Sequence, residues 1–542
     1  MYLNLGQYGK ALEFHEQSLA IHRQIGDRSG EAKSLSNIAL VYLGLGQYEK
    51  ALEHMERALA IERKTGDRQA EGVDLSGIGN LYGDLGQYEK AMGYFEQALA
   101  ISRQIGDRSG EGADLSNIGV IHSKFGRHEK SLEYYQQALA IKKAVGDRDG
   151  EAVDLVNIGI AYFGLGLYEK AREALQRSLA VSLETGAPEI LWKAQRGLGE
   201  VEARLEAYSE AISHYDQAID TIESMRAGLA ETETQTTFME KKLFVYDEFI
   251  DLLQTLHKKD PSKGYDKKAL EIFERKQGRT FLEEMGRSAA SNFSGLPDDV
   301  RAKEAGLADE EAKALSALAH ERSRPVPSGR RELIQNFDDR LRRIKTDQET
   351  LREEIKARYP DYYALKYPRP ATLSELQQTV LRPGELMLVY GVMKESTCLW
   401  VIGREQFEFF TISTGEKGID DEVTEFRSTI LKVLKTIRDH PDEPIEAIAL
   451  RSIGEIERSG RKLYDLLIPE GARETLSKAG TVYIIPTGAL YSLPFEALAA
   501  PGPPDKEGPH YLVQDHSIAY LSSASLLKTL REAAARKKAK AP

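Results

Sequence analysis

The first part of the chain repeats one pattern of apolar and polar positions every 40 residues. Within each unit, apolar side chains lie three or four residues apart in two successive runs, which predicts two amphipathic helices. In the second unit these apolar positions are Leu75, Ile78, Tyr82 and Leu85, followed by Tyr88, Ala91, Phe95 and Leu99. The period therefore predicts a series of stacked helix pairs.

Three sequence markers keep the same phase along this region. They are Gly-Gln-Tyr and its variants at 6–8, 46–48, 86–88, 126–128 and 166–168, Gly-Asp-Arg at 26–28, 66–68, 106–108 and 146–148, and Leu-Ser-Asn-Ile and its variants at 35–38, 75–78, 115–118 and 155–158. Glycine is typical just after a helix and aspartate just before one, so we expect Gly106 to end a helix and Asp107 to begin the next. Small residues such as Gly79 and Ala91 are expected where paired helices approach closely.

These markers resemble the tetratricopeptide repeat, in a 40-residue form common in bacterial signalling and scaffold proteins. The resemblance implies an all-α solenoid over residues 1–228, in which the first helix of each pair lines a concave face. In that family the concave groove holds an extended peptide or a partner helix, so we expect a protein or peptide ligand.

An asparagine recurs at one position of the first helices. Asn37, Asn117 and Asn157 are equivalent, whereas the second unit has Gly77 there and Asn80 nearly one turn later. One interpretation is a ladder of amides that hydrogen-bonds a peptide backbone; the other is that asparagine is merely common at this repeat position. These four residues are our candidate peptide-binding site.

Aromatic residues and Glu-Lys pairs recur in the repeats as well. Tyr82, Tyr162 and Phe163 follow the helical period, which favours core packing over a stacking site. The Glu-Lys pairs at 49–50, 89–90, 129–130 and 169–170 are typical of a solvated helix face.

The repeat spacing ends near residue 225, and residues 229–365 are predicted to form a helical linker. It contains a loop at 260–264, an amphipathic helix from Ala269 to Met285, and a charged helical hairpin split at 325–329. The second arm of the hairpin has a heptad seam, made by Ile334, Phe337, Leu341, Ile344, Gln348, Leu351 and Ile355. The seam is compatible with a hairpin that packs on itself and with a dimerising coiled coil.

After residue 365 the period changes from helical to strand-like. Strands are predicted at Glu385–Val392, Thr397–Ile402 and Gln406–Ile412, then at Thr481–Pro486 and His516–Leu521. Helices are predicted near 420–439 and 453–467, and a last helix follows the Ser522–Ser525 turn. The run at 481–486 is apolar on both faces, which is typical of a strand in a parallel sheet.

The segments Ile485-Pro-Thr-Gly-Ala-Leu-Tyr-Ser-Leu-Pro-Phe-Glu-Ala-Leu498 and Tyr520-Leu-Ser-Ser-Ala-Ser525 resemble the first half of a CHAT domain. Residues 256–265 and 269–279 also resemble the helical linker of such proteins. The resemblance implies a partial caspase-like α/β domain over residues 366–542, in a family that includes cysteine peptidases. The predicted fold class is thus multidomain, with an all-α repeat solenoid, a helical linker and this partial α/β domain.

The catalytic motifs of that family, a Thr-His-Gly strand end and a Ser-Ala-Cys strand end, do not occur in the sequence. Cys398 lies inside an early strand and is expected to be a buried structural thiol. His510 and His516 lie upstream of the family's catalytic elements and receive no catalytic role. A cysteine nucleophile needs a base within hydrogen-bond reach, so we predict no catalytic residues and no peptidase activity for this chain.

A sheet without those later strands would have an unpaired apolar edge beside Val482–Ile485 and Ile518–Leu521, which invites another chain to pair with it. Three functional hypotheses follow. The chain is a scaffold coupled to a caspase-like module that regulates proteolysis or signalling in its full-length form, a non-enzymatic adaptor, or one half of a split cysteine peptidase whose partner chain completes the sheet.

Composition excludes several classes of function and of binding site. The formal net charge of −12 argues against a general nucleic-acid or membrane-surface binder, and no apolar run is long enough to span a membrane. One cysteine excludes an intramolecular disulfide framework, and no phosphate loop or zinc helix occurs, so no cofactor or metal is expected. We expect a cytoplasmic protein. Met1 aligns with Val41 inside a unit, so we also expect further sequence upstream, and a signal there stays open.

Overall fold

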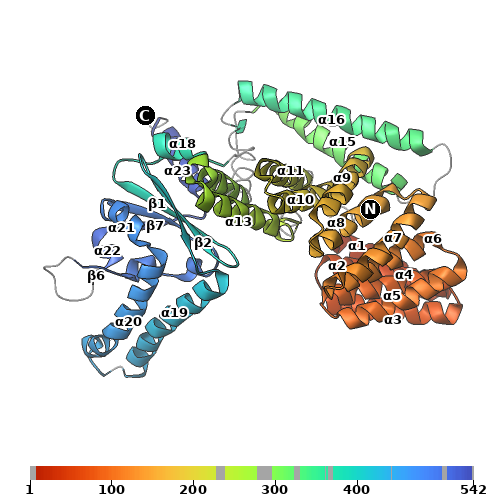
Figure 1. Ribbon diagram of the computed structural model, residues 1–542, viewed down its shortest axis with the longest axis horizontal. Helices are drawn as coiled ribbons and strands as arrows, with labels where there is room; N and C mark the ends of the chain where they lie inside the picture. Colours follow the sequence, from red (N-terminus) through yellow and green to blue (C-terminus); the bar gives the residue numbers. More distant parts are fainter. Residues whose placement is uncertain are drawn as a thin grey trace. The chain divides into compact units, whose positions relative to one another are not determined.

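The computed structural model describes residues 8–227, 238–277, 296–322, 330–359, 362–363, 370–440, 442–502 and 510–539 (Figure 1). The chain divides into two compact units. The first contains residues 1–245 and 312–340, and the second contains residues 246–311 and 341–542.

The first unit consists of the predicted helix pairs, stacked one after another (Figure 1). The first helices of the pairs are α2 (Arg28–Gly44), α4 (Arg68–Asp84), α6 (Arg108–Lys124), α8 (Arg148–Gly164) and α10 (Pro188–Arg204). The second helices are α3 (Tyr48–Thr65), α5 (Tyr88–Ile105), α7 (His128–Val145), α9 (Tyr168–Thr185) and α11 (Tyr208–Ala227), and α1 (Tyr8–Ile25) is equivalent to them. The prediction of two helices every 40 residues is confirmed.

The Gly-Asp-Arg marker is a junction between one unit and the next. Gly106 ends α5 in the left-handed conformation with φ of 73°, and Asp107 caps α6 by accepting a hydrogen bond from the Gly110 backbone N–H at 3.0 Å. The arginine of the marker holds a carboxylate: Arg28 and Arg23 bind the two oxygens of the buried Glu31 at 2.6 and 2.9 Å. The same arrangement recurs at Glu71 and Glu111, and at Glu151 Lys143 takes the place of the second arginine. The junction thus ties the second helix of one unit to the first helix of the next.

Glycine lets the two helices of a pair approach closely. A Cβ added to Gly79 would lie 2.6 Å from the ring of Phe95, which is fully buried on the facing helix. In the pair α2 and α3 the equivalent residues are Ala39 and Met55, so an alanine there faces a flexible side chain. The expectation that small residues occupy these contacts is confirmed.

This contact gives a first prediction. Gly79→Ala should destabilise the repeat region by about 1–3 kcal/mol, since the new methyl group overlaps a rigid ring. The double variant Gly79→Ala/Phe95→Met copies the first pair and should recover most of that loss. Gly93→Ala is the control, because a Cβ there meets no atom within 4 Å. Urea unfolding followed by circular dichroism measures all three, and a Gly79→Ala protein as stable as Gly93→Ala would contradict the prediction.

The helices after the repeats belong to both units. They are α13 (Leu243–Lys259), η2 (Pro261–Lys263) within the predicted loop, a helix at 265–277, α15 (Asp298–Arg322) and α16 (Arg330–Arg358). The predicted helix end at Met285 lies outside the described residues. The heptad seam faces inward, as Ile344, Leu351 and Ile355 are buried. Leu351 and Ile355 cluster with Leu296, against which Val300 and Leu307 of α15 pack, so this end of the hairpin packs on itself.

The second unit is built around a five-stranded mixed sheet in the order β3-β2-β1-β4-β7. The strands are β1 (Glu385–Val392), β2 (Thr397–Gly403), β3 (Phe407–Ile412), β4 (Thr481–Ile485) and β7 (Ser517–Tyr520). β1, β2 and β3 form an antiparallel meander, whereas β4 is parallel to both β1 and β7. A separate two-stranded sheet pairs β5 (Ala499–Ala500) with β6 (His510–Tyr511).

The predicted free edge needs a correction. β4 has a neighbour on each side, so among the described strands only β7 and β3 lie at the edges of this sheet. The side chains of β7 are exposed or half-buried, so this edge is also less apolar than expected. Sequence alone did not show that β1, nearly 100 residues earlier, fills the place beside β4.

Helices cover both faces of the sheet (Figure 1). One face packs against α19 (Glu416–Asp439), α20 (Ile445–Leu467), α21 (Glu470–Ser477) and α22 (Leu512–Asp515), in a core that includes Tyr390, Phe426 and Phe495. On the other face Trp400 packs on Phe273 of the 265–277 helix, with ring centroids 5.1 Å apart. α23 (Ala524–Ala539) lies on this second face, and short turns α18 (Leu373–Glu375), η3 (Leu376–Val380), η4 (Gly488–Ser492) and η5 (Phe495–Ala497) complete the unit.

Candidate functional site

The four candidate asparagines lie on one face of the first helices, which we call the first-helix face. Asn37 of α2 and Asn80 of α4 are exposed, and Asn117 of α6 and Asn157 of α8 are half-buried. None of these four amides has a hydrogen-bond partner among the residues that the structure describes. They are therefore available to a ligand, and their role as a peptide-binding site stays a prediction.

Apolar side chains share this face with the asparagines. Val73 of α4 is 64% exposed and Ile160 of α8 is 43% exposed, although both belong to helices whose other face is buried. Their exposure follows from the helical period: Leu75 and Ile78 point into the core, so positions 73 and 80 point outward.

The aromatic residues and the lysines of the Glu-Lys pairs contact one another. Tyr82 stacks on Tyr94 with centroids 5.4 Å apart, and Lys90 lies 5.0 Å from the Tyr82 ring. Lys50 over Tyr42 and Lys170 over Tyr162 repeat the contact. Half-buried Tyr82, Tyr162 and Phe163 pack on the core clusters, in line with the core interpretation. The lysines are exposed, but they also form cation–π contacts that the sequence interpretation missed.

A buried polar ladder between the units was missed as well. Asp74, Asp114 and Asp154 are equivalent buried residues, and each accepts a hydrogen bond from a serine of the preceding first helix. The serines are Ser36, Ser76 and Ser116. Each aspartate also meets one residue of the preceding second helix, which is Glu62, Ser102 or Lys142. The 40-residue recurrence of both residue types was visible in the sequence.

In the second unit the two CHAT-like segments contact each other directly. After β4, Thr487 accepts a hydrogen bond from the Val392 N–H at 2.9 Å and donates one to the Tyr390 carbonyl at 3.0 Å, which fixes the exit of the chain from the sheet. The Phe495 N–H then donates to the Tyr520 hydroxyl at 2.8 Å, and that hydroxyl donates to Glu496. Burial and the Glu496 carboxylate raise the pKa of Tyr520.

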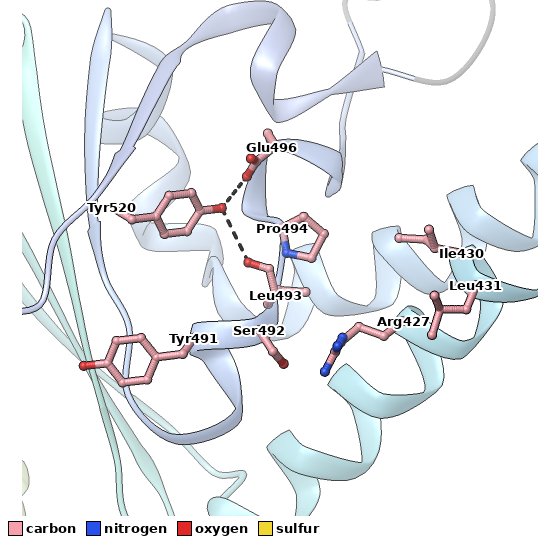
Figure 2. Close-up of a pocket in the computed structure, with 9 residues that line it drawn as sticks. All are labelled: Arg427, Ile430, Leu431, Tyr491, Ser492, Leu493, Pro494, Glu496 and Tyr520. Carbon is pink, nitrogen blue, oxygen red and sulfur yellow. Dashed lines mark hydrogen bonds between the residues drawn. The ribbon is translucent and has the colours of Figure 1, made fainter. Parts of the chain in front are cut away.

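A pocket of about 400 Å³ lies at the carboxyl ends of β4 and β7, between α19 and the segment after β4 (Figure 2). Its lining residues are Arg427, Ile430, Leu431, Tyr491, Ser492, Leu493, Pro494, Glu496 and Tyr520. Figure 2 shows the Arg427 side chain extending from α19 toward Ser492. Tyr491 and Glu496 belong to the CHAT-like motif, whereas Arg427 belongs to no motif and could not be found from sequence. No cysteine or histidine lines this pocket, so its walls offer no thiolate and imidazole pair.

Cys398 and the two C-terminal histidines each have a partner within the second unit. Cys398 is buried in β2, its sulfur accepts a hydrogen bond from Gln254, and burial raises the pKa of its thiol to about 12. His510 contacts Asp515 at 2.7 Å, and the Nδ1 of buried His516 lies 2.7 Å from the Ala479 carbonyl oxygen. The prediction of a buried thiol is confirmed.

Comparison with known families agrees with both parts of the fold. The tetratricopeptide-repeat family model matches residues 1–64, 31–104, 73–144, 112–184 and 151–224, and the CHAT domain model matches residues 457–541. The chain combines tetratricopeptide repeats with a CHAT domain. The CHAT match includes β4, β7 and α23, while β1, β2, β3 and α19 precede it. No curated protein matches the chain.

Several solved structures are similar to part of this chain. BtubC from P. vanneervenii is 20% identical, and the match covers 40% of this chain and 92% of that chain with a TM-score of 0.37. Aspartyl phosphate phosphatase F from Bacillus subtilis is 18% identical, covering 52% and 68%, with a TM-score of 0.41. NprR in complex with its cognate peptide NprX is 17% identical, covering 54% and 82%, with a TM-score of 0.35. The assignment of the repeats rests on the family model and the coordinates.

In the described part of the chain, no group of three or more His, Cys, Asp or Glu side chains is placed to hold a metal ion. No helix in that part is long and apolar enough to cross a membrane.

Proposed function

We propose that this protein is an interaction scaffold whose tetratricopeptide repeats bind a protein or peptide segment on the first-helix face. The observation that carries the proposal is the set of amides at Asn37, Asn80, Asn117 and Asn157, which have no partner among the described residues and lie beside exposed apolar side chains. Polar groups that a fold leaves unpaired beside apolar surface are the usual chemistry of peptide recognition.

The proposal predicts a loss of binding when the amides are removed. Asn117→Ala/Asn157→Ala should reduce the amount of partner captured by the protein from its source cells about tenfold, since each lost hydrogen bond costs on the order of 1 kcal/mol. Gln136→Ala is the matched control, because Gln136 is an exposed amide on the second helix α7. Quantitative mass spectrometry of the captured proteins measures the effect. Equal capture by the two variants would contradict a role for the first-helix face.

The proposal extends to proteins in which such repeats are joined to a CHAT domain that has both catalytic motifs. There, partner binding by the repeats would control a caspase-like cysteine peptidase, in signalling or regulated proteolysis. The sequence as given has neither catalytic motif, and its one thiol is buried and un-ionised. A cytoplasmic and bacterial setting belongs to the same proposal. The lone cysteine supports a reducing compartment.

We therefore predict that the purified 542-residue chain cleaves no peptide above background. The measurement is a fluorogenic peptide assay of the wild-type chain and of Cys398→Ala. The two proteins should be indistinguishable from each other and from buffer. Cleavage that disappears in Cys398→Ala would overturn this prediction.

A second candidate function is assembly through β7, either as an adaptor or as one half of a split peptidase. Among the strands that the structure describes, β7 pairs with β4 only. Because Ser517 and Leu521 donate their N–H groups toward β4, the N–H groups of Ile518 and Tyr520 face the open side. A partner strand added there would complete the sheet. An adaptor should be soluble and stable alone, whereas a split enzyme should gain solubility and peptidase activity when the partner chain is supplied.

A further inference from the structure

The first-helix face differs in charge along its length. Three positions recur on this face in each first helix, at 33, 37 and 40 in α2, where all three are exposed, and every 40 residues thereafter. The middle units, α4, α6 and α8, have no charged residue at any of them, although 29% of the whole chain is charged. We call six of these residues the neutral strip: Val73, Asn80, Asn117, Val153, Asn157 and Ile160.

Charged residues bound the neutral strip at both ends. The position of Val73 and Val153 is occupied by Lys33 in α2 and by Lys193 in α10, and both lysines are exposed. Lys193 is already engaged, since its ammonium group lies 3.3 Å from Glu189 and over the Trp192 ring. Position 200 of α10, equivalent to Ile160, is also charged, because it is Glu200. The strip is therefore a neutral surface of three units between Lys33 at one end and the Lys193 and Glu200 pair at the other.

We propose that the neutral strip binds an extended peptide segment whose side chains are uncharged and mainly aliphatic. This inference rests on the proposed function and specifies its ligand. A charged side chain placed against the strip would lose water without gaining an opposite charge, which costs several kcal/mol. Val73, Val153 and Ile160 instead offer apolar contacts, so the charge pattern selects neutral ligands.

The amides of the strip argue for an extended ligand over a helical one. An asparagine side chain both donates and accepts, and those of Asn80, Asn117 and Asn157 have no partner among the described residues. An extended peptide has free backbone N–H and C=O groups that such amides can pair with. A helix satisfies its own backbone groups and would leave the three amides unpaired.

The experiment begins with a random-peptide phage library selected on the immobilised full chain, with Ile160→Glu as the counter-selection. Enriched peptides should contain a run rich in Val, Ile, Leu and Ala and depleted of Asp, Glu, Lys and Arg. The best enriched peptide is then synthesised with a fluorophore, and its dissociation constant is measured by fluorescence anisotropy. Asn117→Ala and Asn157→Ala should each weaken binding about three- to tenfold, and Gln136→Ala should leave it unchanged.

A second measurement tests whether the bound peptide is extended. Methylating single backbone nitrogens of the bound peptide should weaken binding at alternate positions, because an extended chain presents every second residue to one face. Weakening at no position, or circular dichroism that shows a bound helix, would overturn the inference.

The outcomes separate the inference from the proposed function. Enriched peptides rich in acidic or basic residues that still lose affinity in Asn117→Ala would overturn the neutral ligand but keep the first-helix face as the binding site. Selection that enriches the same peptides on the wild-type chain and on Ile160→Glu would overturn the proposed function itself. Circular dichroism and thermal unfolding of each variant confirm that the exposed substitutions leave the fold intact.

Discussion

Glu274→Ala is expected to destabilise the second unit by about 3–5 kcal/mol, because it leaves a cavity and several buried donors without their acceptor. Glu274 lies in the 265–277 helix and is 1% exposed. Its carboxylate accepts hydrogen bonds from the backbone N–H groups of Ala524 and Ser525 at 3.1 and 3.0 Å and from the Ser525 hydroxyl at 2.6 Å. It therefore caps the first turn of α23, where a negative charge is favoured by the helix dipole.

The same contact continues to a third segment. The Ser525 oxygen accepts a hydrogen bond from the Ala371 N–H at 2.8 Å, at the start of the chain that leads to β1. Losing the carboxylate would leave the α23 donors without a partner and a cavity in their midst, and both effects destabilise. The contact joins the 265–277 helix, residue 371 and α23 into one buried group.

Matched variants identify the cause of the loss. Glu274→Gln keeps the volume and one acceptor, so it should cost roughly 1–3 kcal/mol. Glu271→Ala, on the exposed side of the same helix, should change stability by less than about 0.5 kcal/mol. Urea unfolding can be followed by Trp400 fluorescence in a Trp192→Phe background, since Trp400 is then the only tryptophan. Similar losses for Glu274→Ala and Glu271→Ala would contradict the capping role.

Sequence reasoning could not find this contact. Glu274 was one charged residue in a helix, and its partners lie 250 residues later in the chain. The repeats were predictable because each helix, cap and glycine contact depends on neighbours within about one unit. Strands β1 to β4 and β7 were also predicted, since their apolar runs are local. Their order was not, because pairing between β1 and β4 is set by packing across the whole unit.

The candidate site, too, could be predicted from sequence only in part. The 40-residue period was enough to place Asn37, Asn117 and Asn157 at one equivalent position of the first helices, and their role in binding a peptide stays a prediction. The Ser36 to Asp74 contact and its repeats were missed, although the 40-residue spacing of both residues was legible. The identity of the residue that faces each aspartate changes from unit to unit, and that change has a measurable consequence.

The stability of the repeat region is expected to depend on pH. Glu62 and Asp74 are two buried carboxyls that face each other, and Asp74 also accepts the Ser36 hydroxyl at 2.7 Å. Burial and the facing Asp74 raise the pKa of Glu62 to about 8, and burial raises that of Asp74 to about 6. The other charges nearby are Asp67 and Glu71, and Glu71 is held by Arg63 and Arg68. At neutral pH the folded pair retains a proton that the unfolded chain has released.

The direction of the effect follows from proton linkage. Because the folded state binds more protons between the unfolded pKa near 4.5 and the folded pKa near 8, the free energy of unfolding falls as pH rises through this window. One proton corresponds to a slope of at most about 1.4 kcal/mol per pH unit. The repeat region should thus be most stable on the acidic side of this window and lose this contribution by pH 8.

The chain provides its own control substitutions for Glu62. The equivalent residue is Ser102 in α5, which donates to Asp114 at 2.9 Å, and Lys142 in α7, which lies 3.1 Å from Asp154. Glu62→Ser and Glu62→Lys should therefore fold, gain stability at pH 8 relative to the wild type, and lose most of the decline between pH 6 and 8. Urea unfolding at each pH gives the difference in unfolding free energy between wild type and variant, in which the titrating groups outside the Glu62 and Asp74 pair cancel. If the difference in unfolding free energy stays constant with pH, then Glu62 and Asp74 do not share a proton.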